Sequence, residues 1–234
     1  MQSKVAEDDE SLEADAARSQ LMEAIGKLTE TYLQWRKPDT LHIEEKLEFI
    51  FGAYWKHTTD TPRGLADEVR QMLISGEYVR GELKKAGIQD WAACAVQYVR
   101  ALEREMGYRL YEPGKTELKW GKKVMLPGQF TFGTPGKIYH DRDDQQKANW
   151  QVLLMHVVHP SGATEDAFGH LLKDIDALRE GRNTIAHGEH VASSLAEEVR
   201  DAVLGQMQAG NAGVLVRLVA MLNTPAPGTS SSIG

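Results

Sequence analysis

The chain has 234 residues, a formal net charge of −7 at pH 7 and 41% hydrophobic residues. This length allows one large domain or two small ones with an apolar core, and the excess of acid argues against a general nucleic-acid coat protein. No apolar run approaches the roughly 20 residues that would span a bilayer. A single cysteine, Cys94, excludes an internal disulfide, and we expect a buried thiol in a cytoplasmic protein.

Helical periodicity dominates the first third of the chain. Residues 1–16 are acidic and polar, unlike a secretory signal, and are predicted to form a disordered tail. Apolar side chains at three- and four-residue steps then predict helices over 17–35 and 41–55. A further helix is expected from Thr61-Pro62 to Ile74, with a break at Ser75-Gly76 and a short helix to Ala86. Residues 17–87 are therefore predicted to be an N-terminal helical region.

The middle of the chain combines one long helix with a long connection. Asp90 is expected to cap a helix over 91–106, which Gly107 would end. Residues 108–141 are rich in Gly, Pro and Lys and are predicted to be a connection with a small hairpin around 118–132.

Helices return in the last third of the chain. One helix is expected from Asp143 or Asp144 to Val158, and a second from Thr164 to Gly181. A third is expected from Ser193 or Ser194 to about Gln208. A last helix is expected to reach Leu222, and residues 223–234 are predicted to be a flexible tail. The predicted fold class is all-α.

Positive charge is concentrated in one part of this acidic chain. Eight bases and four acids lie between Arg100 and Lys137, so this stretch can form a local surface that attracts phosphate. Within it, Lys119, Lys122 and Lys123 surround Trp120, which could stack on a base. The alternative interpretation is a solvated loop with long basic side chains and a tryptophan that belongs to the core.

The segment Arg182-Asn183-Thr184-Ile185-Ala186-His187-Gly188 carries the clearest chemical signal. Arginine keeps its charge and offers a planar fork of donors to phosphate oxygens. Histidine titrates near neutral pH and can transfer protons. Gly181 is expected to end the preceding helix, so that Arg182 leaves a helix end and His187 projects from the following turn. The alternative is a plain helix stop, in which Arg182 pairs with a surface carboxylate and His187 caps carbonyls.

This segment resembles the Arg-polar-x(3 to 5)-His signature of the HEPN superfamily, whose all-helical domains include many RNA-cutting toxins and defence nucleases. Two further stretches look similar to bacterial members. Residues 98–105 resemble their first core helix, and residues 130–134 (Phe-Thr-Phe-Gly-Thr) resemble a short Thr-Leu-Gly element between their helices. The resemblance covers about residues 88–222, which we therefore predict to be a HEPN-like helical domain with additional N-terminal helices.

The resemblance implies an RNA endonuclease that needs no metal or cofactor. The ribose 2′-hydroxyl would attack the neighbouring phosphorus, with His187 as general base or acid and Arg182 stabilising the phosphorane. Asn183 would orient the arginine or donate a hydrogen bond to phosphate. Family members commonly pair two such motifs, so a homodimer or a related partner subunit is expected. A prokaryotic toxin or antiviral defence effector would fit this activity, with RNA as the substrate bound by Lys119, Trp120, Lys122 and Lys123.

A second class of function stays open on the sequence. HEPN-like domains without activity exist, and the acidic net charge suits a helical scaffold or adaptor that binds a protein or nucleic-acid partner. His187, Glu189 and His190 also resemble a loose metal cluster, but no third ligand follows at a usual spacing. We therefore predict no metal site. The exposure of His187 is expected to distinguish a ribonuclease from a scaffold or adaptor.

Overall fold

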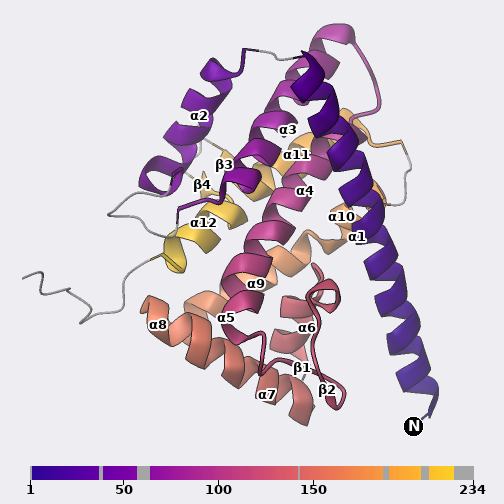
Figure 1. Ribbon diagram of the computed structural model, residues 1–234, viewed down its shortest axis with the longest axis vertical. Helices are drawn as coiled ribbons and strands as arrows, with labels where there is room; N and C mark the ends of the chain where they lie inside the picture. Colours follow the sequence, from indigo (N-terminus) through magenta and orange to yellow (C-terminus); the bar gives the residue numbers. More distant parts are fainter. Residues whose placement is uncertain are drawn as a thin grey trace, which may run out of the picture.

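The computed structural model describes residues 2–36, 39–56, 64–141, 143–186, 190–206 and 211–223. In these residues the chain forms helices joined by turns, with two short antiparallel hairpins (Figure 1). The predicted all-α fold class is confirmed at this level.

In the N-terminal part, three helices contact a fourth, α3 (Asp67–Ala86), which therefore lies at the centre. α3 and α4 lie against each other along most of their length, α1 crosses α4, and α2 lies beside α3 (Figure 1). The helices and the 3-10 turn η1 have these bounds: α1 Gln2–Arg36, α2 Leu41–Phe51, η1 Gly52–Tyr54, α3 Asp67–Ala86 and α4 Ala92–Met106.

Two of the sequence predictions are wrong in this part. The segment 2–16, expected to be a disordered tail, continues α1 as helix, because it contains strong helix formers such as Ala, Glu and Leu and neither Gly nor Pro. The expected break at Ser75-Gly76 is absent, since α3 runs unbroken through both. Gly76 instead permits a close approach to α4, because a Cβ there would lie 3.0 Å from Cε1 of Tyr98. The expected start at Thr61-Pro62 lies outside the described residues.

The prediction that Gly107 ends the helix is wrong. The chain continues there through a π-helical turn that buries Leu110 and Tyr111. The expected long connection is therefore largely structured, and its hairpin is shorter than predicted, with Gly121 at a φ of 59° in the turn. The elements are η2 Gly107–Tyr111, α5 Glu112–Gly114, β1 Lys119–Trp120, β2 Lys123–Val124, the 3-10 turn η3 Pro127–Gln129 and α6 Thr134–His140.

The last third contains the helices that carry the candidate site. Two predicted caps are confirmed, because Asp143 accepts from N of Gln146 at 2.7 Å and Thr164 accepts from N of Ala167 at 3.2 Å. The elements are α7 Asp144–Leu153, η4 Leu154–Val158 (a π-helical turn), α8 His159–Ser161, α9 Glu165–Ala177, α10 Arg179–Ala186, α11 Ser193–Leu204, β3 Gly205–Gln206, β4 Asn211–Ala212 and α12 Val214–Met221.

The helix that was expected to reach Gln208 ends earlier. α11 stops at Leu204, and Gly205, with a φ of 94°, turns the chain into the β3–β4 hairpin. A side chain at Gly205 would meet the backbone of the opposite strand at Asn211, so only glycine fits this position. The predicted tail over 223–234 lies, from residue 224 onward, outside the described residues.

One apolar core extends from Met22 of α1 through Leu73 of α3 and Leu102 of α4 to Leu218 of α12. The core thus joins the predicted N-terminal region (17–87) to the predicted HEPN-like region (88–222). Burial of this continuous surface is the main driving force that fixes the helices relative to one another.

Candidate functional site

Arg182 and Asn183 lie within α10, not after the end of a helix. The break between α9 and α10 falls at Leu178, and N of Arg182 donates to its carbonyl at 2.9 Å. The predicted stop at Gly181 is therefore wrong. Gly181 faces α11, where an added Cβ would lie 3.3 Å from Cγ2 of Val199, so its small size serves the packing of α10 on α11.

The Arg182 side chain points into the protein and is only 2% exposed. Its Nη2 donates to Oε1 of Glu103 on α4 at 3.2 Å, and its Nη1 donates to Oδ1 of Asn183 at 3.1 Å. A buried guanidinium must be paired in this way, because an uncompensated charge away from water is very costly. In the single chain, two of the donors that were predicted to bind phosphate, Nη1 and Nη2, are thus engaged by the protein itself.

His187, the third predicted catalytic residue, lies outside the described residues, together with Gly188 and Glu189. Its neighbours on either side are described: Ala186 is buried at the end of α10, and His190 is exposed before α11. The expected convergence of arginine and histidine stays a prediction.

Residues 98–105 and residues 130–134 both lie against α10, which contains the start of the third stretch that carries the resemblance. Residues 98–105 form most of α4, which contacts α10 and supplies Glu103. In residues 130–134, Gly133 lies beside the start of α10, because a Cβ there would be 3.7 Å from Nε of Arg179. Thr131 and Thr134 are buried and close this turn by a hydrogen bond of 3.0 Å from N of Thr131 to Oγ1 of Thr134.

The N-terminal helix α1 covers this region. It contacts both α4 and α10 (Figure 1). It also pairs with a second buried arginine, Arg100 of α4, which is 4% exposed. Arg100 pairs with Glu23 at 3.1 Å and with Glu30 at 2.8 Å, both from α1. Gln97 of α4 donates to the carbonyl of Gly26 at 3.1 Å, so polar contacts as well as the core fix α1 on α4.

Burial and ion pairing shift the pKa of Glu23 in opposite directions. Partial burial acts to raise the pKa of Glu23, but the attraction of Arg100, its hydrogen bond and the nearby Arg104 outweigh burial and lower that pKa below its usual value of 4.5. Glu23 therefore stays ionised at neutral pH and keeps α1 bound to α4.

The four predicted RNA-binding residues form the β1–β2 hairpin and its turn. The backbone of Lys119 is held by Asn149 of α7, whose side chain accepts at 2.9 Å and donates at 3.0 Å. Trp120 is half-buried against the core, and Nζ of Lys137 on α6 lies 5.3 Å from the centre of its ring. Lys122 and Lys123 are exposed. The contacts of this hairpin are thus with α6 and α7, and the exposed side chains of Lys119, Lys122 and Lys123 are open to a ligand.

Glu103 and the Arg100 cluster were not predicted from the sequence. Glu103 belongs to the segment that carries the resemblance, but nothing in its spacing distinguishes it from the exposed acids of that helix. The partners of Arg100 are 70 and 77 residues away in the chain, so only the tertiary structure reveals the pair.

Cys94 does not act as a nucleophile in this structure. It is fully buried, and burial raises the pKa of its thiol to about 12. Among the described residues, no three His, Cys, Asp or Glu side chains are grouped so as to hold a metal ion. Within the same residues, no helix combines the length and the apolar character needed to cross a bilayer.

Neither a family model, nor a curated protein, nor a solved structure matches this chain at a significant level. The site must therefore be interpreted from its own residues.

Proposed function

We propose that this chain is a metal-independent RNA endonuclease of the HEPN type, acting as a prokaryotic toxin or defence effector. The observation that supports it is that residues 98–105 and 130–134 both lie against α10, with Arg182 joined to Glu103 and with Asn183 four residues before His187. Residues 98–105 reach α10 at Arg182 and residues 130–134 reach it at Arg179, so segments that are distant in sequence share one helix, as expected if they belonged to one domain of this family.

In the proposed reaction, His187 takes the proton of the ribose 2′-hydroxyl as its oxygen attacks the adjacent phosphorus. The 5′-oxygen leaves and takes up a proton from water, while His187 returns its own proton to the solvent, which gives a 2′,3′-cyclic phosphate and a 5′-hydroxyl end. Arg182 stabilises the charge on the phosphorane oxygens, and Asn183 orients it through the hydrogen bond to Nη1. DNA lacks the attacking hydroxyl and is not cut.

The burial of Arg182 makes the described conformation a resting state in this proposal. A substrate phosphate must replace the carboxylate of Glu103 as the partner of the guanidinium, which exchanges one charged hydrogen bond for another. Pairing of two chains about a two-fold axis would place two such motifs in one cleft, so we propose a homodimer or a related partner subunit in the cytoplasm.

The decisive variant is His187→Ala, because replacement of the buried Arg182 would disturb the fold as well as the chemistry. Purified protein in EDTA should cleave single-stranded RNA to cyclic phosphate ends, and His187→Ala should abolish cleavage. His190→Ala is the matched control, since it removes an exposed histidine three residues further along, and it should cut at the wild-type rate. Cleavage that survives in His187→Ala would exclude this mechanism.

A second candidate is a helical scaffold or adaptor without catalytic activity. The specific observation that favours it is the 2% exposure of Arg182, which in the single chain serves as a buried link between α10 and α4. In this case the wild type and His187→Ala would cut no RNA, and both would capture the same partner.

A further inference from the structure

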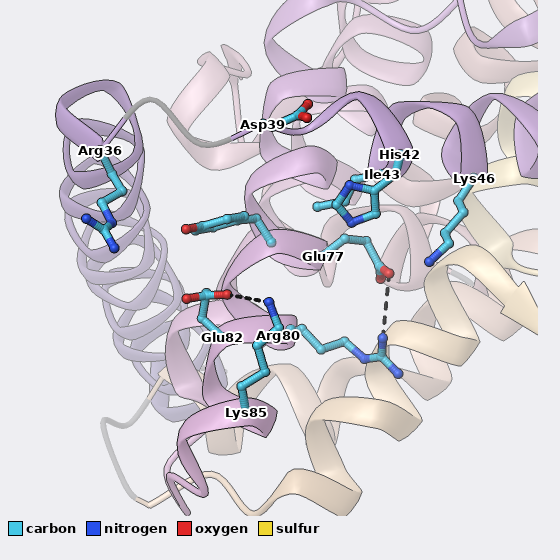
Figure 2. Close-up of a pocket in the computed structure, with 11 residues that line it drawn as sticks. Arg36, Asp39, His42, Ile43, Lys46, Glu77, Arg80, Glu82 and Lys85 are labelled. Carbon is cyan, nitrogen blue, oxygen red and sulfur yellow. Dashed lines mark hydrogen bonds and ion pairs between the residues drawn. The ribbon is translucent and has the colours of Figure 1, made fainter.

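A cleft of about 490 Å³ opens between the end of α1, the first half of α2 and the second half of α3 (Figure 2). Its volume is typical of sites for small molecules, which span roughly 300–1,000 Å³. Ile43, which is 6% exposed, and the half-buried Tyr78 contribute apolar and aromatic surface to its lining. The remaining lining is mostly charged.

The acidic side chains of the cleft already have partners. Glu77 pairs with Arg80 at 3.6 Å and with Arg200, and it accepts from the hydroxyl of Tyr98 at 2.8 Å. Glu82 pairs with Lys85 at 2.9 Å (Figure 2). Asp39 accepts from N of Leu41 at 3.1 Å at the start of α2. Glu77 and Glu82 are therefore neutralised by cations of the protein, whereas Asp39 keeps its charge at the start of α2.

Two cations of the cleft have no acidic partner among the residues that the structure describes. Arg36 is the last residue of α1, and Lys46 lies in the middle of α2; Figure 2 shows them at opposite sides of the pocket, with His42 between them. Both are exposed and free to move toward a ligand. In a chain of net charge −7, two unpaired cations in one concave site mark a place for an anion.

We propose that this cleft binds a nucleotide-sized phosphorylated molecule. Arg36 and Lys46 hold its phosphate groups, the arginine through its planar fork and the lysine as a point charge. Tyr78 and Ile43 receive its planar ring. The site is built from α1, α2 and α3, whereas Arg182 belongs to α10, so the proposal is independent of RNA cleavage.

The test measures binding of ADP to the full chain by isothermal titration calorimetry at low salt, with inorganic pyrophosphate as a second ligand. ADP should bind more tightly than pyrophosphate, because only ADP carries a ring. Lys46→Gln should raise the Kd for ADP about fivefold to tenfold. The matched control is Lys84→Gln, which removes an exposed lysine of α3 that does not line the cleft, and it should leave the Kd unchanged.

Three results would overturn the proposal. Absence of ADP binding, or equal Kd values for Lys46→Gln and Lys84→Gln, would exclude this cleft as the site. Pyrophosphate that binds as tightly as ADP would exclude a nucleotide as the ligand class. Because the readout is binding, none of these results depends on whether the chain cleaves RNA.

Discussion

Nη2 of Arg182 donates a hydrogen bond of 3.2 Å to Oε1 of Glu103, and this contact joins α10 to α4 across 79 residues of sequence. Arg182 is almost completely buried, whereas the side chain of Glu103 is 19% exposed. Glu103 thus provides a negative charge at the edge of the core for a positive charge inside it.

Removal of this counter-charge should destabilise the fold. Glu103→Gln removes the charge of a carboxylate that is hydrogen-bonded to the buried Arg182 guanidinium, and we expect the free energy of unfolding to fall by about 2–3 kcal/mol. Urea denaturation followed by circular dichroism measures the change. The control is Glu112→Gln, because Glu112 pairs with Lys115 at 2.8 Å in an exposed i,i+3 contact, and such pairs contribute about 0–1 kcal/mol. Equal effects of the two variants would show that the Arg182 pair carries no special stability.

At Gly26, the backbone of α1 lies directly against the side chain of Arg100 on α4. A Cβ at this position would overlap the guanidinium of Arg100, which is held by Glu23 and Glu30 and has little room to move. Gly26→Ala should therefore lower the free energy of unfolding by about 1–3 kcal/mol, as measured by the shift in urea midpoint.

The matched control for this variant is Gly81→Ala in α3. A Cβ at Gly81 meets nothing within 4 Å, so the better helix propensity of alanine should stabilise the protein by about 0.5–1 kcal/mol. If Gly26→Ala stabilised the protein as well, the close approach of α1 to Arg100 would be contradicted.

The inner faces of α4 and α9 could be predicted from the sequence, because apolar residues at three- and four-residue steps indicate which side of a helix is buried. The same pattern was misleading in α1, where Leu28, Tyr32 and Trp35 of the apolar stripe are exposed. The caps at Asp143 and Thr164 were equally readable, since a cap acts over three residues. Local chemistry was sufficient for these features.

The glycines were misleading for a physical reason. Gly76 and Gly181 were interpreted as helix breaks, but both lie inside helices where a neighbouring helix approaches closely. Sequence alone cannot distinguish a glycine that ends a helix from one that admits a neighbour, because the neighbour is distant in the chain. The inward direction of the Arg182 side chain was missed for the same reason, because the helix was expected to end before this residue.

Low pH should weaken the attachment of α1 to α4. The pKa of Glu23 is lowered in the folded protein from its usual 4.5, so the unfolded chain binds this proton more readily and folding stability falls as the pH drops below about 4.5 toward the folded-state pKa. The stabilisation is fully present above that range. The loss of unfolding free energy between pH 7 and pH 4 should be smaller in Glu23→Gln than in the wild type. An identical loss in both proteins would contradict a contribution of this carboxylate.

The turn of the β1–β2 hairpin gives the last prediction, which concerns RNA binding. Lys122 and Lys123 are exposed, whereas one face of Trp120 lies near Lys137 and the ring packs on the core. If these lysines contact RNA, they do so through phosphate, so their effect should depend on salt and not on base sequence. The double variant Lys122→Gln, Lys123→Gln should reduce the slope of log K against log salt by up to about 1.4 for single-stranded RNA.

Fluorescence anisotropy of a labelled oligonucleotide at several salt concentrations measures this slope. The matched control is the double variant Lys147→Gln, Lys173→Gln, which removes two exposed lysines from α7 and α9 and changes the net charge equally. If both double variants changed the slope to the same extent, the general charge of the protein would account for binding and the hairpin would have no specific part in it. A reduction confined to the hairpin variant would locate the phosphate contacts at this turn, because the two proteins differ only in where the positive charge is lost.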